Sequence, residues 1–327
     1  NAPAVNARAA SFLNAGPCLE LGLTIGGQSS RVAWEVMNKA VRITAALALS
    51  VGLISGSSNA EVLAASTTTT STKVPVPDSM ERKERRIKAG GEKRTYWVSA
   101  PKDAKDRELP LILAFHGKTD TAKNFLENSG LGHADAIVVA PDGLAKKDVC
   151  DDKFKQAWSP APYAVTTSQQ DFALVDALLA KMDKEFNIDP ERIYLTGFSN
   201  GGGFVASVIA QRPKPFAGAV IVSAAVRNSE SELRTGLPVP LRIIHGDKDQ
   251  QVPLEGYNRP TNVKGCKDGP DDVVLDIRDV RSAFLLRSGS TNVSYHEVKG
   301  MGHKWIHDEP IDVTDEVLDF FDIPKQG

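Results

Sequence analysis

The chain has 327 residues, of which 41% are hydrophobic and 24% charged, and its formal net charge is −2 at pH 7. The length suits one large domain or two small ones, and the composition is that of a globular protein. The balanced charge gives no basis for a global attraction to nucleic acid or to anionic membranes.

Residues 37–60 carry the three-part pattern of a secretory signal. Lys39 and Arg42 form a basic start, an uncharged apolar stretch follows, and Ser58 and Ala60 supply the small residues of a cleavage site. The apolar stretch is short for a membrane span, so we expect no stable insertion. A buried helix is the alternative. The pattern predicts a secreted protein, either extracellular or periplasmic.

The signal is one of four parts that we expect in the chain. We expect residues 1–36 to be a disordered upstream or non-native segment and residues 61–79 to be a Thr/Ser/Pro-rich linker. Residues 80–327 are then the folded domain. The basic stretch "ERKERRIKAGGEKR" is interpreted as solvated surface, with a polyanion site as the lesser alternative.

From residue 92 onward, short apolar runs alternate with amphipathic segments. The runs predict strands at 93–100, 109–115, 136–143, 192–198, 217–225, 241–247 and 292–298. The amphipathic segments predict helices at 168–187, 202–212, 271–289 and 310–322. Because this alternation is typical of a mostly parallel sheet covered by helices on both faces, we predict a single-domain α/β fold.

Ligands of open α/β sheets bind at the carboxyl ends of the strands. Ser199 lies there, in "GFSNG", between a predicted strand and a predicted helix. Gly-x-Ser-x-Gly at such a junction is typical of a strained turn that projects a nucleophilic serine, and Gly197 and Gly201 give the clearance it needs. A simple turn serine is the alternative.

A serine nucleophile needs a base, and a histidine base needs an acid. Among the six histidines, His303 follows the last predicted strand on a loop and is the expected base, with His307 as the alternate. No third ligand accompanies this pair, so we predict no metal and no cofactor. Asp249 in "HGDKDQQVP" is the expected acid, with Asp247 as the alternative.

Acyl transfer also needs donors for an oxyanion. We expect the amide of Asn200 and that of Lys118 or Thr119, after the strand that ends in "HG". His116, Trp158 and Trp305 are expected to line the substrate site. The alternative for the tryptophans is that they cover the rim of the core. Cys150 and Cys266, in an exported chain, predict a disulfide, with two free buried thiols as the alternative.

Six motifs in order, "LPLILAFHG", "VVAPDGL", "QDFALVDALLAKM", "IDPERIYLTGFSNGGGFV", "HGDKDQQVP" and "MGHKW", give a specific resemblance. The chain resembles the secreted α/β-hydrolase esterases of the polyhydroxybutyrate depolymerase and feruloyl esterase group, carbohydrate esterase family one. The resemblance implies a triad of Ser199, Asp249 and His303 and an oxyanion donor after His116 and Gly117. It also implies disulfides near the site, which Cys150 and Cys266 would fit.

The sequence therefore predicts a secreted, monomeric serine esterase. The expected substrates are feruloyl or aryl esters of plant cell-wall polysaccharides, or polyester oligomers of the hydroxyalkanoate or aromatic kind. An acyltransferase on the same triad is one alternative. A glycan- or matrix-binding protein with vestigial hydrolysis is another.

Overall fold

The computed structural model describes residues 77–147, 154–260, 271–287, 292–308 and 310–326. The predicted upstream segment, the signal and most of the linker lie outside the described residues, as do Cys150 and Cys266. Among the described residues, no helix is both long and apolar enough to cross a bilayer.

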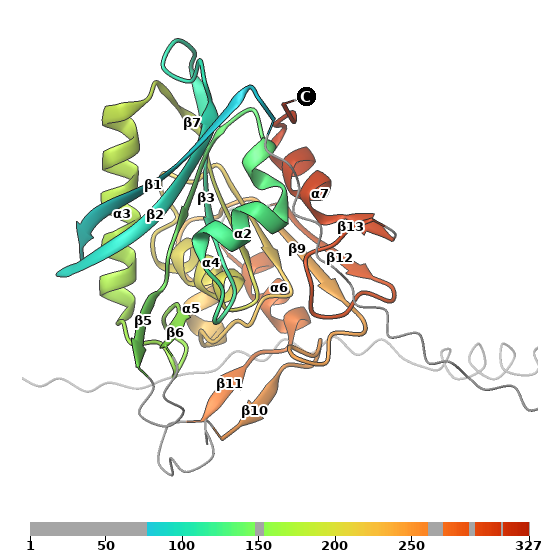
Figure 1. The fold of residues 1–327 in the computed structure, drawn as a ribbon. Coiled ribbons are helices and arrows are strands. Elements are labelled where there is room, and N and C mark those ends of the chain that lie inside the picture. Colours follow the sequence, from blue (N-terminus) through green and yellow to red (C-terminus); the bar gives the residue numbers. More distant parts are fainter. Residues whose placement is uncertain (1–76, 148–153, 261–270, 288–291, 309, 327) are drawn as a thin grey trace, which may run out of the picture. The chain divides into compact units, whose positions relative to one another are not determined.

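An eight-stranded sheet with the order β1-β2-β4-β3-β7-β8-β9-β12 forms the centre (Figure 1). β2 pairs antiparallel with β1 and β4, and the remaining neighbours pair parallel. The strands are β1 (Met80–Ala89), β2 (Glu92–Pro101), β3 (Leu109–Phe115), β4 (Ile137–Pro141), β7 (Ile188–Phe198), β8 (Gly218–Val222), β9 (Leu241–Gly246) and β12 (Val293–Val298). The prediction of a mostly parallel sheet is confirmed.

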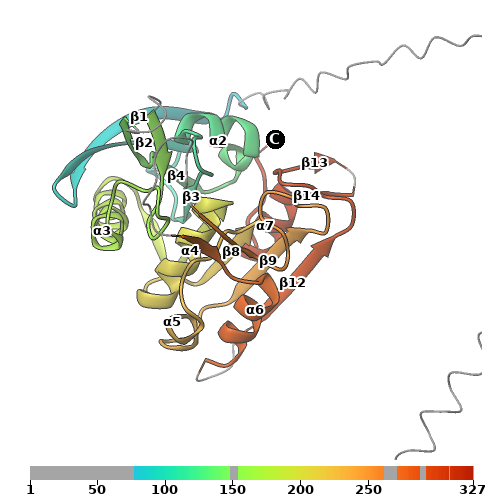
Figure 2. The same ribbon diagram turned by 90° about the horizontal axis from the view of Figure 1, so that it is seen from below.

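Helices cover both faces of the sheet, as the continuous apolar strands predict (Figure 2). One face carries α3 (Ser168–Glu185), α4 (Asn200–Gln211), α5 (Glu230–Arg234) and α6 (Ile277–Leu285), and the other carries α2 (Ala122–Ser129) and α7 (Val313–Phe321). A short 3-10 helix, η1, spans Leu131–His133. Three small hairpins complete the described chain: β5 (Leu144–Lys147) with β6 (Phe154–Ala157), β10 (Tyr257–Arg259) with β11 (Asp272–Val274), and β13 (His307–Asp308) with β14 (Ile311–Asp312).

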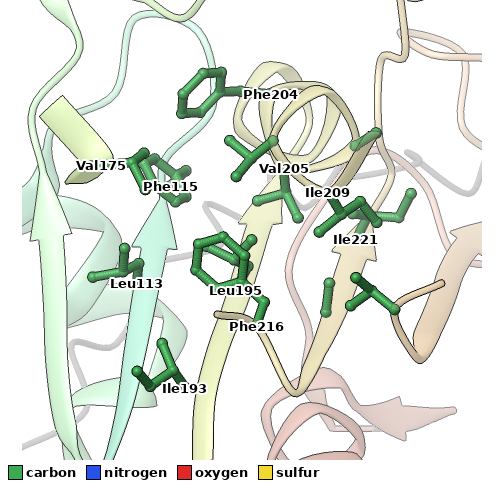
Figure 3. Close-up of a cluster of buried hydrophobic side chains, with 14 of the residues drawn as sticks. Leu113, Phe115, Val175, Ile193, Leu195, Phe204, Val205, Ile209, Phe216 and Ile221 are labelled. Carbon is green, nitrogen blue, oxygen red and sulfur yellow. The ribbon is translucent and has the colours of Figure 1, made fainter. Parts of the chain in front are cut away.

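Strand β3 shows how the sheet builds two cores. Leu113 and Phe115 pack with residues of α3 and α4 on one face. The Phe115 ring meets that of Phe204 on α4 edge-to-face, with centroids 5.0 Å apart (Figure 3). Ile112, which points the other way, belongs to the cluster under α2 and α7. Because every β3 side chain is buried, alternation is absent from its sequence, and the strand appears as one apolar run.

The basic stretch was interpreted as solvated surface, with a polyanion site as the lesser alternative, and no strand was predicted there. Most of it forms strand β1 and the turn that leads into β2. Gly90 and Gly91 have φ values of 60° and 85°, and two consecutive residues with positive φ are typical of a tight hairpin turn. β1 is an edge strand, and its outward charges discourage pairing with another chain. The helix predicted at 271–289 is also corrected, because its first residues form β11 and the helix begins at Ile277.

Helix α4 approaches the sheet closely enough to touch its backbone. A Cβ atom on Gly201 would lie 2.2 Å from the Phe115 carbonyl oxygen, and one on Gly203 would lie 2.0 Å from that of Ala225. Both distances are far below van der Waals contact, so only glycine permits this approach. The helix N-terminus is thereby fixed against β3 and the segment after β8.

Gly203→Ala should destabilise the protein by about 1–3 kcal/mol or more, because the backbone of α4 or of Ala225 must move. Gly218→Ala is the matched control. Its Cβ atom would meet ordinary contacts, the nearest at 3.5 Å, so its effect should stay below about 1 kcal/mol. Urea denaturation of both variants gives the comparison, and equal unfolding free energies would contradict the tight approach.

Candidate active site

Ser199 occupies the turn between β7 and α4. Its φ and ψ are 55° and −119°, and a positive φ is uncommon for a residue that has a Cβ atom. Its amide donates to the Val222 carbonyl at 2.9 Å, and its carbonyl accepts from the amides of Gly203 and Ala225, both at 3.0 Å. Bonds to β8 and α4 therefore hold the strained turn at the carboxyl edge of the sheet.

The Ser199 hydroxyl is not used as a helix cap, although Ser199 is the N-cap residue of α4. In the other described α-helices, the N-cap side chain accepts a hydrogen bond from the helix backbone. Ser199 makes no such bond. Its Oγ lies instead 2.9 Å from Nε2 of His303, so the hydroxyl is directed toward a base.

His303 links the serine to an acid. Its Nδ1 lies 2.8 Å from Oδ2 of Asp249. Asp249 follows β9, and His303 lies on the loop after β12, which pairs parallel with β9. Because parallel neighbours end at the same edge of a sheet, the two loops meet beside Ser199. The structure thus brings the three predicted side chains into one hydrogen-bonded chain.

Asp249 is held on both oxygens. Its Oδ1 accepts from the amides of Gln251 at 3.0 Å and Val252 at 2.8 Å. Burial raises the pKa of this carboxyl, but the hydrogen bonds from His303 and Val252 outweigh burial, and the net pKa lies below its ordinary value. The ionised carboxylate therefore orients the His303 ring with Nδ1–H toward itself and Nε2 toward the serine. His245 lies behind it: its Nε2 is 2.8 Å from the Val252 carbonyl and 3.5 Å from Oδ2 of Asp249.

Asp247 was the alternative acid and His307 the alternative base, but both side chains bind elsewhere. Asp247 Oδ1 accepts from the Gly300 amide at 2.7 Å, which ties the loop after β9 to the turn after β12. His307 donates through Nε2 to the Asn128 carbonyl, at the end of α2. Neither side chain is hydrogen-bonded to Ser199 or His303 in the described structure.

The hydrogen bonds of the backbone N–H groups near Ser199 show which of the predicted oxyanion donors are available. Asn200 is the first residue of α4, so its amide has no acceptor within the helix. The Thr119 amide donates to the Gln156 carbonyl at 2.9 Å, so the prediction for Thr119 is wrong because that donor is already used. Lys118 remains the candidate on the loop after β3, and it lines the same cleft as Ser199.

Trp158 and His116 were predicted to contact substrate, and both predictions are wrong because both side chains are fully buried. The Trp158 indole N–H donates to the His116 carbonyl at 3.0 Å. The Asn200 side chain binds the Trp158 backbone twice, accepting from its amide at 2.8 Å and donating to its carbonyl at 3.0 Å. Trp158 also stacks on Phe204 of α4, with ring centroids 5.4 Å apart. These residues support the nucleophile turn from beneath.

Trp305 is also placed away from the cleft. Its indole N–H donates to Thr314 Oγ1 at 2.9 Å, and its ring packs edge-to-face on Phe125 at 5.3 Å. It therefore fixes the loop after His303 to α2 and α7. The prediction that it lines the substrate site is wrong, because its indole is packed between these two helices.

A cleft of about 510 Å³ opens over Ser199 and His303. The sequence did not reveal most of its polar lining, because these residues lie beyond the strand ends or on the β10–β11 hairpin. An arginine five residues past β8 gives only a weak signal, and tyrosines on a hairpin give none. The unpredicted lining residues discussed below are Asp120, Tyr163, Arg227, Tyr257, Arg259 and Asp272.

His116 allows a test of the buried arrangement beneath the nucleophile turn. The Gly143 amide donates to its Nε2 at 2.9 Å, and its Nδ1 lies 2.7 Å from the Gly117 carbonyl oxygen. Burial lowers the pKa of this imidazole. We therefore expect nitrogen NMR shifts of a neutral Nδ1–H tautomer that do not change between about pH 8 and pH 5.

His307 is the internal reference for this measurement, because the Asp312 carboxylate, 3.6 Å from its Nδ1, raises its pKa. His307 should therefore become protonated before His116 as the pH falls. Protonation of His116 near the ordinary histidine value of about 6.5 would contradict the buried arrangement.

Comparison with known proteins identifies relatives of this chain. The sequence model of the family described as "Putative esterase" matches residues 87–265. A protein of Nocardia uniformis subsp. tsuyamanensis, described as "Putative esterase NocK", is 28% identical over 226 residues, which are 66% of this chain and 62% of that protein. A "Probable feruloyl esterase C" of Aspergillus niger is 25% identical over 174 residues, or 50% of this chain and 57% of that protein. The chain thus spans about three fifths of the length of these relatives.

The fold has relatives among solved structures. A ferulic acid esterase of Anaeromyces mucronatus, solved with ferulic acid, superposes with a TM-score of 0.54 at 17% identity, covering 77% of this chain and 93% of that one. The predicted α/β-hydrolase fold is confirmed. Because the family match spans more than half of the sequence, the chain belongs to this esterase family.

Proposed function

We propose that this protein is a secreted serine esterase that hydrolyses carboxylic esters through an acyl-enzyme. The observation that carries the proposal is the position of His303, which lies 2.9 Å from the Ser199 hydroxyl and 2.8 Å from the Asp249 carboxylate. This is the arrangement that a serine, a base and an orienting acid need for nucleophilic catalysis.

The reaction begins with attack of Ser199 Oγ on the ester carbonyl carbon, while His303 Nε2 takes the hydroxyl proton. The Asp249 carboxylate stabilises the positive charge of the resulting imidazolium. The amides of Asn200 and Lys118 stabilise the oxyanion, with further support from the N-terminus of α4. His303 then gives its proton to the leaving alkoxide, and the alcohol departs. In the second half, His303 takes a proton from water, hydroxide attacks the acyl carbon, and Ser199 regains its proton as the acid is released.

The substrate classes in the proposal follow from the motif resemblance and from the relative described as a feruloyl esterase. They are feruloyl or aryl esters of plant polysaccharides and oligomers of hydroxyalkanoate or aromatic polyesters. The signal pattern of residues 37–60 supports secretion. We expect the protein to act as a monomer.

Ser199→Ala should lower kcat for 4-nitrophenyl butyrate by about six orders of magnitude, because the serine and its base act as a unit. The variant should keep the thermal stability of the unmodified protein. Hydrolysis that remains within tenfold of the unmodified protein would end the proposal.

The two aspartates give a second test. Asp249→Asn should lower kcat on the order of 10⁴-fold, because it disturbs the tautomer and charge that His303 needs. Asp247→Asn, a matched change two residues away, should cost far less, because Asp247 holds only the Gly300 loop. Steady-state kinetics of both variants gives the ranking, and the reverse order would move the role of the acid to Asp247.

A further inference from the structure

The cleft over Ser199 contains a continuous row of cations and tyrosines. Lys118 Nζ lies 3.8 Å from the ring centroid of Tyr163, and Arg259 Cζ lies 3.9 Å from that of Tyr257. Arg227 Nη2 joins the two rings, with the Tyr163 hydroxyl at 3.0 Å and the Tyr257 hydroxyl at 3.3 Å. We call these five residues the cationic belt.

The belt is assembled from separate parts of the chain. Lys118 follows β3, Tyr163 precedes α3, and Arg227 follows β8. Tyr257 and Arg259 belong to β10, whose hairpin with β11 extends beyond the main sheet (Figure 1). Arg227 fixes this hairpin to the domain, because it binds both oxygens of Asp272 on β11, at 2.6 and 3.1 Å. The position of the belt therefore depends on a nearly buried ion pair rather than on loose surface side chains.

The two aspartates that line the cleft are both engaged. Asp272 pairs with Arg227 and also accepts from the Tyr257 hydroxyl at 3.2 Å. Asp120 accepts from the Thr121 amide and from Asn124 Nδ2, both at 2.8 Å, at the N-terminus of α2. A helix N-terminus stabilises negative charge. Of the arginines that line the cleft, Arg227 is matched by Asp272, whereas Arg259 is exposed.

The cations beside the rings change what the tyrosines offer to a ligand. A tyrosine ring in a cleft commonly stacks on an apolar or aromatic group. Here each ring already carries a cation on one face, so that a ligand in the cleft meets positive charge beside the rings. The contact of Arg259 with the Gln251 carbonyl is long, at 3.5 Å, and leaves most of its guanidinium donors for other partners.

Tyr163 adds a hydrogen-bond donor to the same place. Its oxygen accepts from Arg227, and no described residue accepts its proton. Burial raises the pKa of this phenol, so that the O–H persists over the physiological range. A hydroxyl whose oxygen is bound by a guanidinium is a stronger donor than an ordinary phenol. A carboxylate is the group that the Arg259 guanidinium and a polarised hydroxyl would bind best.

We propose that the cationic belt binds a carboxylate on the part of the ester that does not react, so that the enzyme prefers esters with a free acid group. Such esters include the acid end of an oligoester and an ester on a uronic acid. The inference rests on the proposed esterase function and specifies its substrate class.

The test compares esters that differ only in charge. One pair carries the difference on the acyl side: the mono-4-nitrophenyl ester of adipic acid and the 4-nitrophenyl ester of adipamic acid. The second pair carries it on the alcohol side: 4-(butanoyloxy)benzoate and 4-(butanoyloxy)benzamide. We expect the carboxylate to have a kcat/KM about tenfold higher than the carboxamide in at least one pair at about 20 mM salt. The ratio should shrink at about 500 mM salt.

Variants assign the preference to the belt. Arg259→Gln and Tyr163→Phe should each reduce the carboxylate-to-carboxamide ratio at least threefold. Arg86→Gln is the matched control for charge, because Arg86 lies on the edge strand β1 with an 83% exposed side chain. It should leave the ratio unchanged. Thermal unfolding of each variant verifies that it is folded.

Two results would overturn the inference. One is a ratio near one for both pairs at low salt. The other is a ratio that Arg259→Gln leaves intact or that Arg86→Gln reduces equally, since the preference would then come from the overall charge. In both cases the carboxamide esters are still hydrolysed through Ser199, so the proposed function stands. Failure of the proposed function would appear differently, as no Ser199-dependent hydrolysis of any of the four esters.

Discussion

The close approach of α4 to the sheet is the constraint on which the rest of the site depends. Gly201 and Gly203 let the first turn of the helix touch the carbonyls of Phe115 and Ala225. The turn before the helix must then be so tight that Ser199 adopts a positive φ. Its backbone groups are bound by Val222, Gly203 and Ala225, so packing and hydrogen bonds together compensate for the strain.

This constraint extends outward from the turn. The Asn200 side chain binds the Trp158 backbone on both its amide and its carbonyl. The loop that carries Trp158 is held again by Asp171, which accepts from the Ser159 amide at 3.0 Å and pairs with buried Arg94. On the other side, the loops after β9 and β12 are joined by Asp247 and Gly300. The side chains that meet at Ser199 are therefore positioned by residues that take no part in the reaction themselves.

The sequence was informative where burial leaves a strong local pattern. β3, β4 and β8 are buried on both faces, so each appears as an uninterrupted apolar run. Ser199, Asp249 and His303 follow β7, β9 and β12, whose sequences are more mixed but whose ends the alternation of strands and helices still indicates. β1 was missed because an edge strand keeps its charged residues in solvent. The burial of Trp158 was not predicted because it depends on the buried ion pair of Arg94 with Asp171 and on the two hydrogen bonds between the Asn200 side chain and the Trp158 backbone. Both interactions join residues that are far apart in sequence. Arg227 was missed because its partners come from a hairpin whose approach no local pattern specifies.

The central claim is that Ser199 is an activated nucleophile because His303 accepts its proton. Labelling the intact protein with an alkyl fluorophosphonate, followed by peptide mass spectrometry, tests this claim most directly. The account predicts one phosphonylated site, at Ser199, and loss of labelling in a His303→Ala variant that remains folded. Labelling at another residue, or equal labelling of Ser199 without the histidine, would contradict it.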